Sequence, residues 1–192
     1  MFLQFIEGPV ADPQAFRRQL ERWHEDCAEG ASGWLGSTAG VTPDGIGFLA
    51  ARFDSAEAAR ANSDRPEQSA WWAETEKCFD GPASFTDSED VVLMRGGGSD
   101  SAGFVQVIRG RLTDVEAARA SFTEDMPDDV RPDVLGGTIG ILPNGSYTMV
   151  VYFTSEAEAR AGEAQEPDEQ MDDLHVTPPR YLDLPDPWLW SA

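Results

Sequence analysis

The sequence has few basic residues and no long apolar run. Only 14 of its 192 residues are Lys or Arg, against 35 Asp or Glu, so the formal net charge is −21. Phosphate backbones and anionic membrane surfaces bind clustered basic side chains, and this charge opposes both partners. No stretch approaches the roughly 20 apolar residues that cross a bilayer, and the opening MFLQFIEG lacks the basic start of a signal peptide. We expect no nucleic-acid partner and no membrane partner.

Cysteine and histidine are also scarce. Cys27 and Cys78 lie far apart and form no CxxC pair, so a disulfide scaffold is not expected and a reducing cytoplasm is the simplest location. His24 and Cys27 share one face of a predicted helix, but a metal site needs three or four convergent ligands. The sequence therefore predicts no bound metal.

What the sequence does contain is an internal repeat. Residues 2–17 match residues 104–119 at an offset of 102, and residues 34–61 match residues 134–161 at 11 of 28 positions without gaps. Chance would give about two such matches, and these include the Pro and Gly of predicted turns. The GGGSDS segment at 96–101 separates the copies and is typical of a flexible linker. We predict residues 1–95 as the first unit and 102–192 as the second.

Each copy predicts the order strand, helix, strand, strand, helix, strand. In the first copy the strands are expected at about 2–7, 33–41, 46–53 and 84–94. This order is the ferredoxin-like split βαβ arrangement, in which helices cover one sheet face and the other face must also be buried. The predicted fold class is α+β: two tandem ferredoxin-like βαββαβ units that form an intrachain, pseudo-dimeric α/β barrel.

Capping residues mark the predicted helix starts. Asp12, Ser55 and Ser155 precede helical patterns, and Thr113 with Glu116 forms a capping box in the second copy. The second helix of the first copy is expected to break near Asn62 and to restart with Asp64 as its cap. The prolines of the closing RYLDLPDPWLW run limit it to edge pairing or an irregular tail.

Three segments carry a resemblance to a known family: FLQFIEG at 2–8, FDSAEAARANSDRPEQSAWW at 53–72 and its echo FTSEAEAR at 153–160. Over its whole length the chain resembles the dimeric α/β barrel superfamily, and within it the antibiotic-biosynthesis-monooxygenase-like group. That group includes cofactor-free oxygenases of polycyclic phenols, haem-degrading enzymes and members without an assigned activity. The resemblance implies a small-molecule ligand, no cofactor, and a monomer or a homodimer.

In the oxygenases of this group the protein helps to deprotonate the substrate, and the resulting carbanion reacts with oxygen. The family draws an Asn, a Trp and a Tyr from or near the second helix. Asn62 and Trp71 match as catalytic residues and Trp72 as a substrate-binding residue, but the first copy contains no tyrosine. We expect a pocket between helices and sheet in residues 1–95.

Strand residues are expected to line the same pocket. Gln4, Arg52 and Arg95 are the candidates, and an arginine there would suit an anionic or enolic ligand. The second copy departs from this set, because Asn62 aligns with Gly162 and the paired tryptophans align near residues 171–173, which are Met-Asp-Asp.

Plainer interpretations stand beside these roles. Asn62 is also typical of a residue that ends a helix, and adjacent tryptophans point about 100° apart, so at most one faces a pocket squarely. Core packing is the default for Trp71 and Trp72. The functional alternatives are a non-catalytic small-molecule-binding or stress-associated barrel and, more remotely, a haem-binding barrel that uses His175.

Overall fold

The computed structural model describes residues 1–123, 131–164 and 175–192. These residues form an α+β structure of two five-stranded antiparallel sheets and five α-helices. The strands are β1 (Phe2–Pro9), β2 (Trp34–Val41), β3 (Ile46–Phe53), β4 (Ser84–Ser88), β5 (Asp90–Met94), β6 (Phe104–Arg111), β7 (Val134–Ile141), β8 (Ser146–Phe153), β9 (Arg180–Leu184) and β10 (Trp188–Ser191). The helices are α1 (Pro13–Asp26), α2 (Ala56–Ser63), α3 (Pro66–Thr75), α4 (Val115–Thr123) and α5 (Glu156–Glu163).

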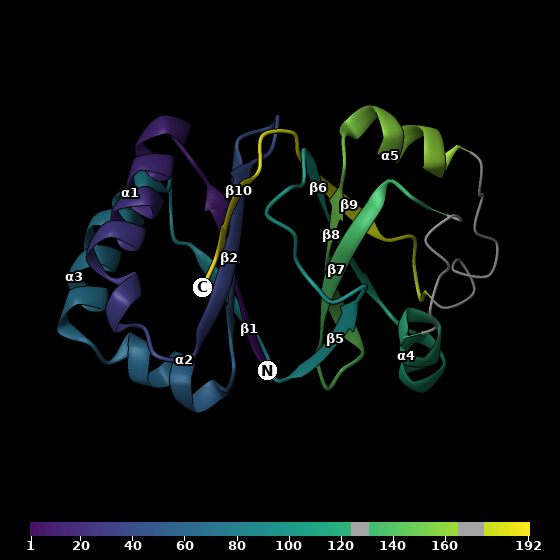
Figure 1. Ribbon diagram of the computed structural model, residues 1–192, viewed down its shortest axis with the longest axis horizontal. Coiled ribbons are helices and arrows are strands. Elements are labelled where there is room, and N and C mark those ends of the chain that lie inside the picture. The colour runs from purple at the N-terminus through teal and green to yellow at the C-terminus, as the bar shows by residue number, and fades with distance from the viewer. Residues whose placement is uncertain (124–130, 165–174) are drawn as a thin grey trace. The chain divides into compact units, whose positions relative to one another are not determined.

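The chain divides into two compact units. Unit 1 consists of Met1–Glu89 with Trp188–Ala192, and unit 2 consists of Asp90–Pro187. The strand order is β10-β2-β3-β1-β4 in the sheet of unit 1 and β5-β7-β8-β6-β9 in the sheet of unit 2. Figure 1 shows α1, α2 and α3 against one face of the first sheet, and α4 and α5 against one face of the second. The first unit predicted from the sequence ends at residue 95, whereas the compact units change over between Glu89 and Asp90.

This difference arises because each sheet takes an edge strand from the other sequence repeat. The end of the first repeat, β5, pairs with β7, and the end of the chain, β10, pairs with β2. The single strand predicted at 84–94 is therefore wrong, since β4 pairs with β1 and β5 joins the other sheet. The polar residues 87–90 (Asp-Ser-Glu-Asp) offer no apolar side chain to continue one sheet face. Edge pairing of the closing run is confirmed, because β9 and β10 are both outermost strands.

Most of the predicted caps are confirmed. The Asp12 carboxylate accepts hydrogen bonds from the backbone N–H groups of Gln14 and Ala15 at 2.9 and 3.0 Å. The Ser55 and Ser155 hydroxyls cap α2 and α5 in the same way. These three helices therefore begin where the sequence predicts.

The other two predicted caps are wrong. Helix α4 uses Asp114 rather than Thr113, since the Asp114 carboxylate accepts from the Ala117 N–H at 3.0 Å. Asp64 is not the cap of α3, because its backbone is still helical (φ −77°, ψ −7°) and closes α2. Helix α3 instead begins at Pro66 after Arg65, with no side-chain cap. The fixed φ of proline at the first helical position replaces the capping bond as the start signal.

Two apolar clusters fill the space between the sheet and helices of unit 1. One is built around Phe16, Leu20 and Trp188, and the other around Trp23 and Trp34. All six tryptophans of the chain belong to unit 1 and all three tyrosines to unit 2. Of the helices that the structure describes, none combines the length and the apolar character that spanning a membrane requires.

Candidate functional site: an aromatic cavity in unit 1

A cavity lies in unit 1 between the sheet and its covering helices, in the region where the sequence predicts a pocket. It holds about 550 Å³ of non-atom space, part of which is open solvent at its mouth. A cavity of this kind admits several waters or a small organic ligand. The lining residues are Gln4, Ile6, Leu20, Trp23, His24, Trp34, Ser37, Leu49, Ala51, Phe53, Ala59, Asn62, Ser63, Gln68, Trp71 and Trp190.

Indole rings form much of the cavity wall. Trp23 lies edge-on to Trp34 and to Trp71, with ring centroids 5.2 and 6.4 Å apart. Trp190 reaches the same wall from β10, and its ring stacks on the imidazole of His24 at 4.3 Å. A wall of this kind favours planar aromatic ligands, which bind indoles by stacked or edge-on contact.

The indole N–H groups of three of these tryptophans are already paired within the protein. Trp23 donates to the side-chain oxygen of Gln68 at 2.6 Å and Trp34 to the hydroxyl of Ser37 at 3.0 Å. Trp71 donates to the backbone carbonyl of Gln19 at 2.7 Å. Because these bonds fix the rings, the rings present apolar surface rather than hydrogen-bond donors to the cavity.

Asn62 supplies a donor that the protein itself does not use. The residue is buried in the last turn of α2, and its Oδ1 accepts from the Arg65 guanidinium at 2.9 Å. A guanidinium only donates, so it fixes the amide with Oδ1 towards Arg65. The Nδ2 group has no hydrogen-bond partner among the residues that the structure describes. Asn62 therefore lies in the last turn of a helix and also lines the cavity with an unused amide N–H pair.

Gln4 contributes the complementary acceptor. Its side chain lines the cavity from β1, and its Nε2 donates to the carboxylate of Asp87 at 3.0 Å. That bond turns the amide so that Oε1 is the polar atom left for other partners.

His24 is a cavity residue for which the sequence suggested only metal ligation. It projects from α1 among three indole rings, with centroid distances of 5.1 Å to Trp23, 5.2 Å to Trp34 and 4.3 Å to Trp190. Burial among these rings lowers the pKa of His24 from 6.5 to about 4, because the apolar surroundings disfavour the charged imidazolium. His24 is therefore neutral at physiological pH. Its position one residue after Trp23 on an amphipathic helix is the sequence signal that could have identified it as a cavity residue.

The structure places three other sequence candidates away from this cavity. Trp72 packs against Phe79 and Phe85, so only one of the adjacent tryptophans faces the cavity, as expected. Arg52 follows the cavity residue Ala51 on β3 and so lies on the opposite sheet face, where its guanidinium fills the space that a Cβ on Gly36 would occupy.

Arg95 is the third of these candidates. It belongs to unit 2, where its guanidinium donates to the backbone carbonyl of Arg131 at 2.8 Å. With Arg52 and Arg95 both outside the cavity, no Arg, Lys, Asp or Glu is found among its lining residues in the described parts of the chain. This removes the basis for expecting an anionic ligand and favours a neutral one.

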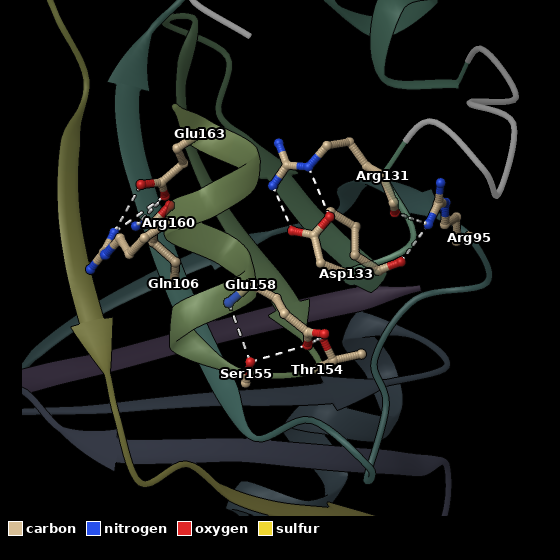
Figure 2. A network of polar contacts seen from close by, with 10 residues as sticks. Arg95, Gln106, Arg131, Asp133, Thr154, Ser155, Glu158, Arg160 and Glu163 are labelled. Carbon is tan, nitrogen blue, oxygen red and sulfur yellow. Dashed lines mark hydrogen bonds and ion pairs between the residues drawn. The ribbon is translucent and has the colours of Figure 1, made fainter. Parts of the chain in front are cut away.

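The corresponding region of unit 2 carries an ion-pair network (Figure 2). The Arg131 guanidinium makes two bonds to the Asp133 carboxylate, at 2.9 and 2.7 Å, and this pairing lowers the pKa of Asp133. A Cβ built on Gly162, which aligns with Asn62, would lie 2.5 Å from Nε of Arg131. Gln106, the counterpart of Gln4, donates to Asp183 and also to Glu163. Residues 171–173, which align near the paired tryptophans, lie outside the described residues.

The metal and haem alternatives receive no support from the geometry. Within the described ranges, no group of three or more His, Cys, Asp or Glu side chains is placed to hold a metal ion. The Nε2 atom of His175 lies 2.6 Å from the hydroxyl oxygen of Tyr147, in a hydrogen bond that haem ligation through this nitrogen would have to break.

Comparisons with known proteins give the fold. No protein-family model matches the sequence, and no curated protein matches it significantly. A "putative monooxygenase" from Lactobacillus acidophilus NCFM aligns over 98% of both chains with a TM-score of 0.74 and 12% identity. Another "putative monooxygenase", from Fusobacterium nucleatum, covers 99% of this chain and 94% of its own, with a TM-score of 0.79 and 10% identity.

A third structure supplies the fold name. It is an uncharacterized ferredoxin fold protein from Listeria monocytogenes that is related to antibiotic biosynthesis monooxygenases. It covers 100% of this chain and 95% of its own, with a TM-score of 0.52 and 8% identity. This chain has a monooxygenase-like, ferredoxin-like fold. The resemblance inferred from the three sequence segments is thereby confirmed at the level of the fold.

Proposed function

We propose that this chain binds a neutral aromatic small molecule in the unit 1 cavity and oxidises an aromatic or enolisable substrate with O₂, as a cofactor-independent monooxygenase does. The observation that carries the proposal is the pairing of an indole-lined wall with the unused Nδ2 donor of Asn62. The monooxygenase-like fold, with its two structural relatives named as monooxygenases, supports the reaction type.

The roles follow from the cavity geometry. Trp71 provides a rigid face on which the ligand ring stacks, because its N–H is held by Gln19. Asn62 donates to the substrate oxygen on which negative charge develops when the substrate loses a proton. In the net reaction a substrate CH₂ group becomes C=O, one atom of O₂ enters that carbonyl and the other leaves as water. The substrate supplies all the electrons, so no external reductant is required.

The test is oxygen uptake with anthrone, a tricyclic ketone that enolises to a phenol. We expect Asn62→Asp to lower kcat/KM on the order of 10²-fold, the usual effect of losing one oxyanion donor. This variant keeps an oxygen that accepts from Arg65 and replaces the cavity donor with a carboxylate oxygen, which cannot donate and repels an oxyanion. Asn144→Asp is the matched control, because Asn144 lies in an exposed turn of unit 2.

Two outcomes would contradict the assignment. Equal turnover in the wild type and Asn62→Asp would remove Asn62 from the reaction. If Trp71→Ala leaves the KM for anthrone unchanged, the substrate does not stack in this cavity.

A second candidate function is non-catalytic binding of the same class of ligand. The observation that favours it is the absence of any tyrosine from unit 1, since the family pattern includes one. It predicts a saturable change in tryptophan emission on adding the ligand, with no product after prolonged incubation in air. Trp71→Ala would abolish that change, whereas product formation would exclude a purely binding role.

We further propose that the two sequence repeats form the intrachain pseudo-dimeric barrel that the resemblance implies. The exchanged edge strands support it, because β5 and β10 each extend from one repeat into the sheet of the other unit. A solution mass of 20.9 kDa would match a single chain that completes the arrangement alone, and twice that mass would indicate an additional homodimer.

A further inference from the structure

His24 is the one ionisable side chain among the described residues that line the cavity. Neither of its ring nitrogens has a hydrogen-bond partner in the part of the chain that the structure describes. A neutral imidazole has one N–H donor and one bare nitrogen acceptor. An unpartnered imidazole in an otherwise uncharged cavity therefore has its acceptor free for a ligand hydroxyl.

We propose that His24 is a catalytic residue that takes the hydroxyl proton of a neutral phenolic or enolic substrate bound in the cavity. This inference rests on the proposed function and names the group that handles the proton. In the step, the substrate O–H bond breaks, its electron pair stays on the substrate oxygen, and a new N–H bond forms on the imidazole. A neutral pair thus becomes an imidazolium and an oxyanion, with no change in total charge.

Two sets of contacts reduce the cost of charging the buried His24 in this step. The imidazolium would lie flat against Trp190 and beside Trp34, and indole faces attract cations. The oxyanion would receive the Nδ2 donor of Asn62. Because no other charge lines the cavity within the described residues, the substrate oxyanion is the counter-ion of the imidazolium. Formation of the ion pair offsets part of the effect of burial that otherwise keeps His24 neutral.

The chemistry of His24 also narrows the substrate class. With a pKa of about 4 in this cavity, His24 is a weak base. The extent of proton transfer to it therefore rises with the acidity of the substrate hydroxyl. This favours acidic hydroxyls, such as that of a nitrophenol or of the enol of a 1,3-dicarbonyl compound.

The test uses 4-nitrophenol as the probe, because its phenol and phenolate forms absorb at different wavelengths. The dye is titrated with protein at a pH where free dye is almost entirely phenol. We expect the dye bound to the wild type to show the phenolate band, with a phenolate-to-phenol ratio at least roughly tenfold above that of free dye at the same pH. His24→Gln keeps a donor and an acceptor but is not basic, and we expect it to bind the dye as phenol.

Two controls make the result specific. His24→Phe keeps an aromatic ring against Trp190 and tests whether packing alone produces the band. His175→Gln removes the other histidine of the chain, which lies in unit 2, and should leave the spectrum of the bound dye unchanged.

The outcomes separate this inference from the proposed function. Bound dye that stays phenol in the wild type, or a phenolate band that persists in His24→Gln, overturns the role of His24. In that case, dye affinity that still falls in Trp71→Ala leaves the cavity function standing. Failure of the dye to bind overturns the substrate class argued here, whereas the proposed function fails only if anthrone oxidation is also absent.

Discussion

Replacing His24 with phenylalanine should make unit 1 less sensitive to mild acid. The folded protein holds the pKa of His24 at about 4, whereas the ordinary value is 6.5. Between these values the unfolded chain binds a proton that the folded chain does not. Stability therefore falls as pH falls through this window, and is fully retained above about 6.5.

The magnitude follows from the two pKa values. Between pH 7 and pH 5 the full difference would remove about 2 kcal/mol of unfolding free energy. His24 is only partly buried, so solvent screening reduces this to about 1 kcal/mol. His24→Phe retains a ring against Trp190 but cannot take up a proton, so it should lack this loss.

The assay is urea unfolding of both proteins at pH 7 and pH 5, followed by tryptophan emission. Because all six tryptophans belong to unit 1, the signal reports the unit that contains His24. The 35 acidic residues are the same in both proteins, so their titration cancels in the difference. An equal loss of stability in the wild type and the variant between the two pH values would refute the reasoning.

Two further predictions concern packing around Gly162 and the burial of the two cysteines. Alanine at a helical glycine normally stabilises, but Gly162→Ala should lower the unfolding free energy by about 1 kcal/mol, because its Cβ meets the Arg131 guanidinium that Asp133 holds. In an Arg131→Ala background, Gly162→Ala should instead stabilise the protein. Thermal denaturation of the wild type, the two single variants and the double variant checks this. Stabilisation by Gly162→Ala in both backgrounds would contradict the prediction. Burial raises the pKa of both cysteine thiols, but Cys27 is 2% exposed and Cys78 is half-buried, so a thiol reagent should label Cys78 faster by on the order of tenfold. Peptide mass spectrometry at timed intervals checks the order, which equal labelling rates would refute.

The sequence predicts those features that depend on neighbouring residues. The caps at Asp12, Ser55 and Ser155 are local, since each side chain bonds a backbone N–H two or three residues ahead. Helix geometry also predicts that at most one of Trp71 and Trp72 faces the cavity squarely, but it does not say which, and the structure places Trp71 there.

Features that depend on strand register were not predictable in the same way. Gln4 pairs with Ala51, so Ala51 shares its sheet face and the next residue, Arg52, points to the other face. A shift of one residue would have reversed this, and the pairing of β1 with β3 joins residues that are far apart in sequence. The division of residues 84–94 between two sheets likewise depends on partners more than 40 residues away in sequence, at β1 and β7.

Trp190 shows most clearly why local sequence patterns do not predict the whole candidate site. It stands near the end of the chain, yet β10 pairs with β2 through Trp190 and Ser37 and so places its indole on the ring of His24. A fragment of residues 1–95 would lack this wall of the cavity, and its own β5 would be without its partner β7. The cavity therefore requires the second repeat even though no described residue of unit 2 lines it. The second repeat supplies that strand, whereas the region of unit 2 that corresponds to the cavity holds Gly162 and the Arg131–Asp133 ion pair.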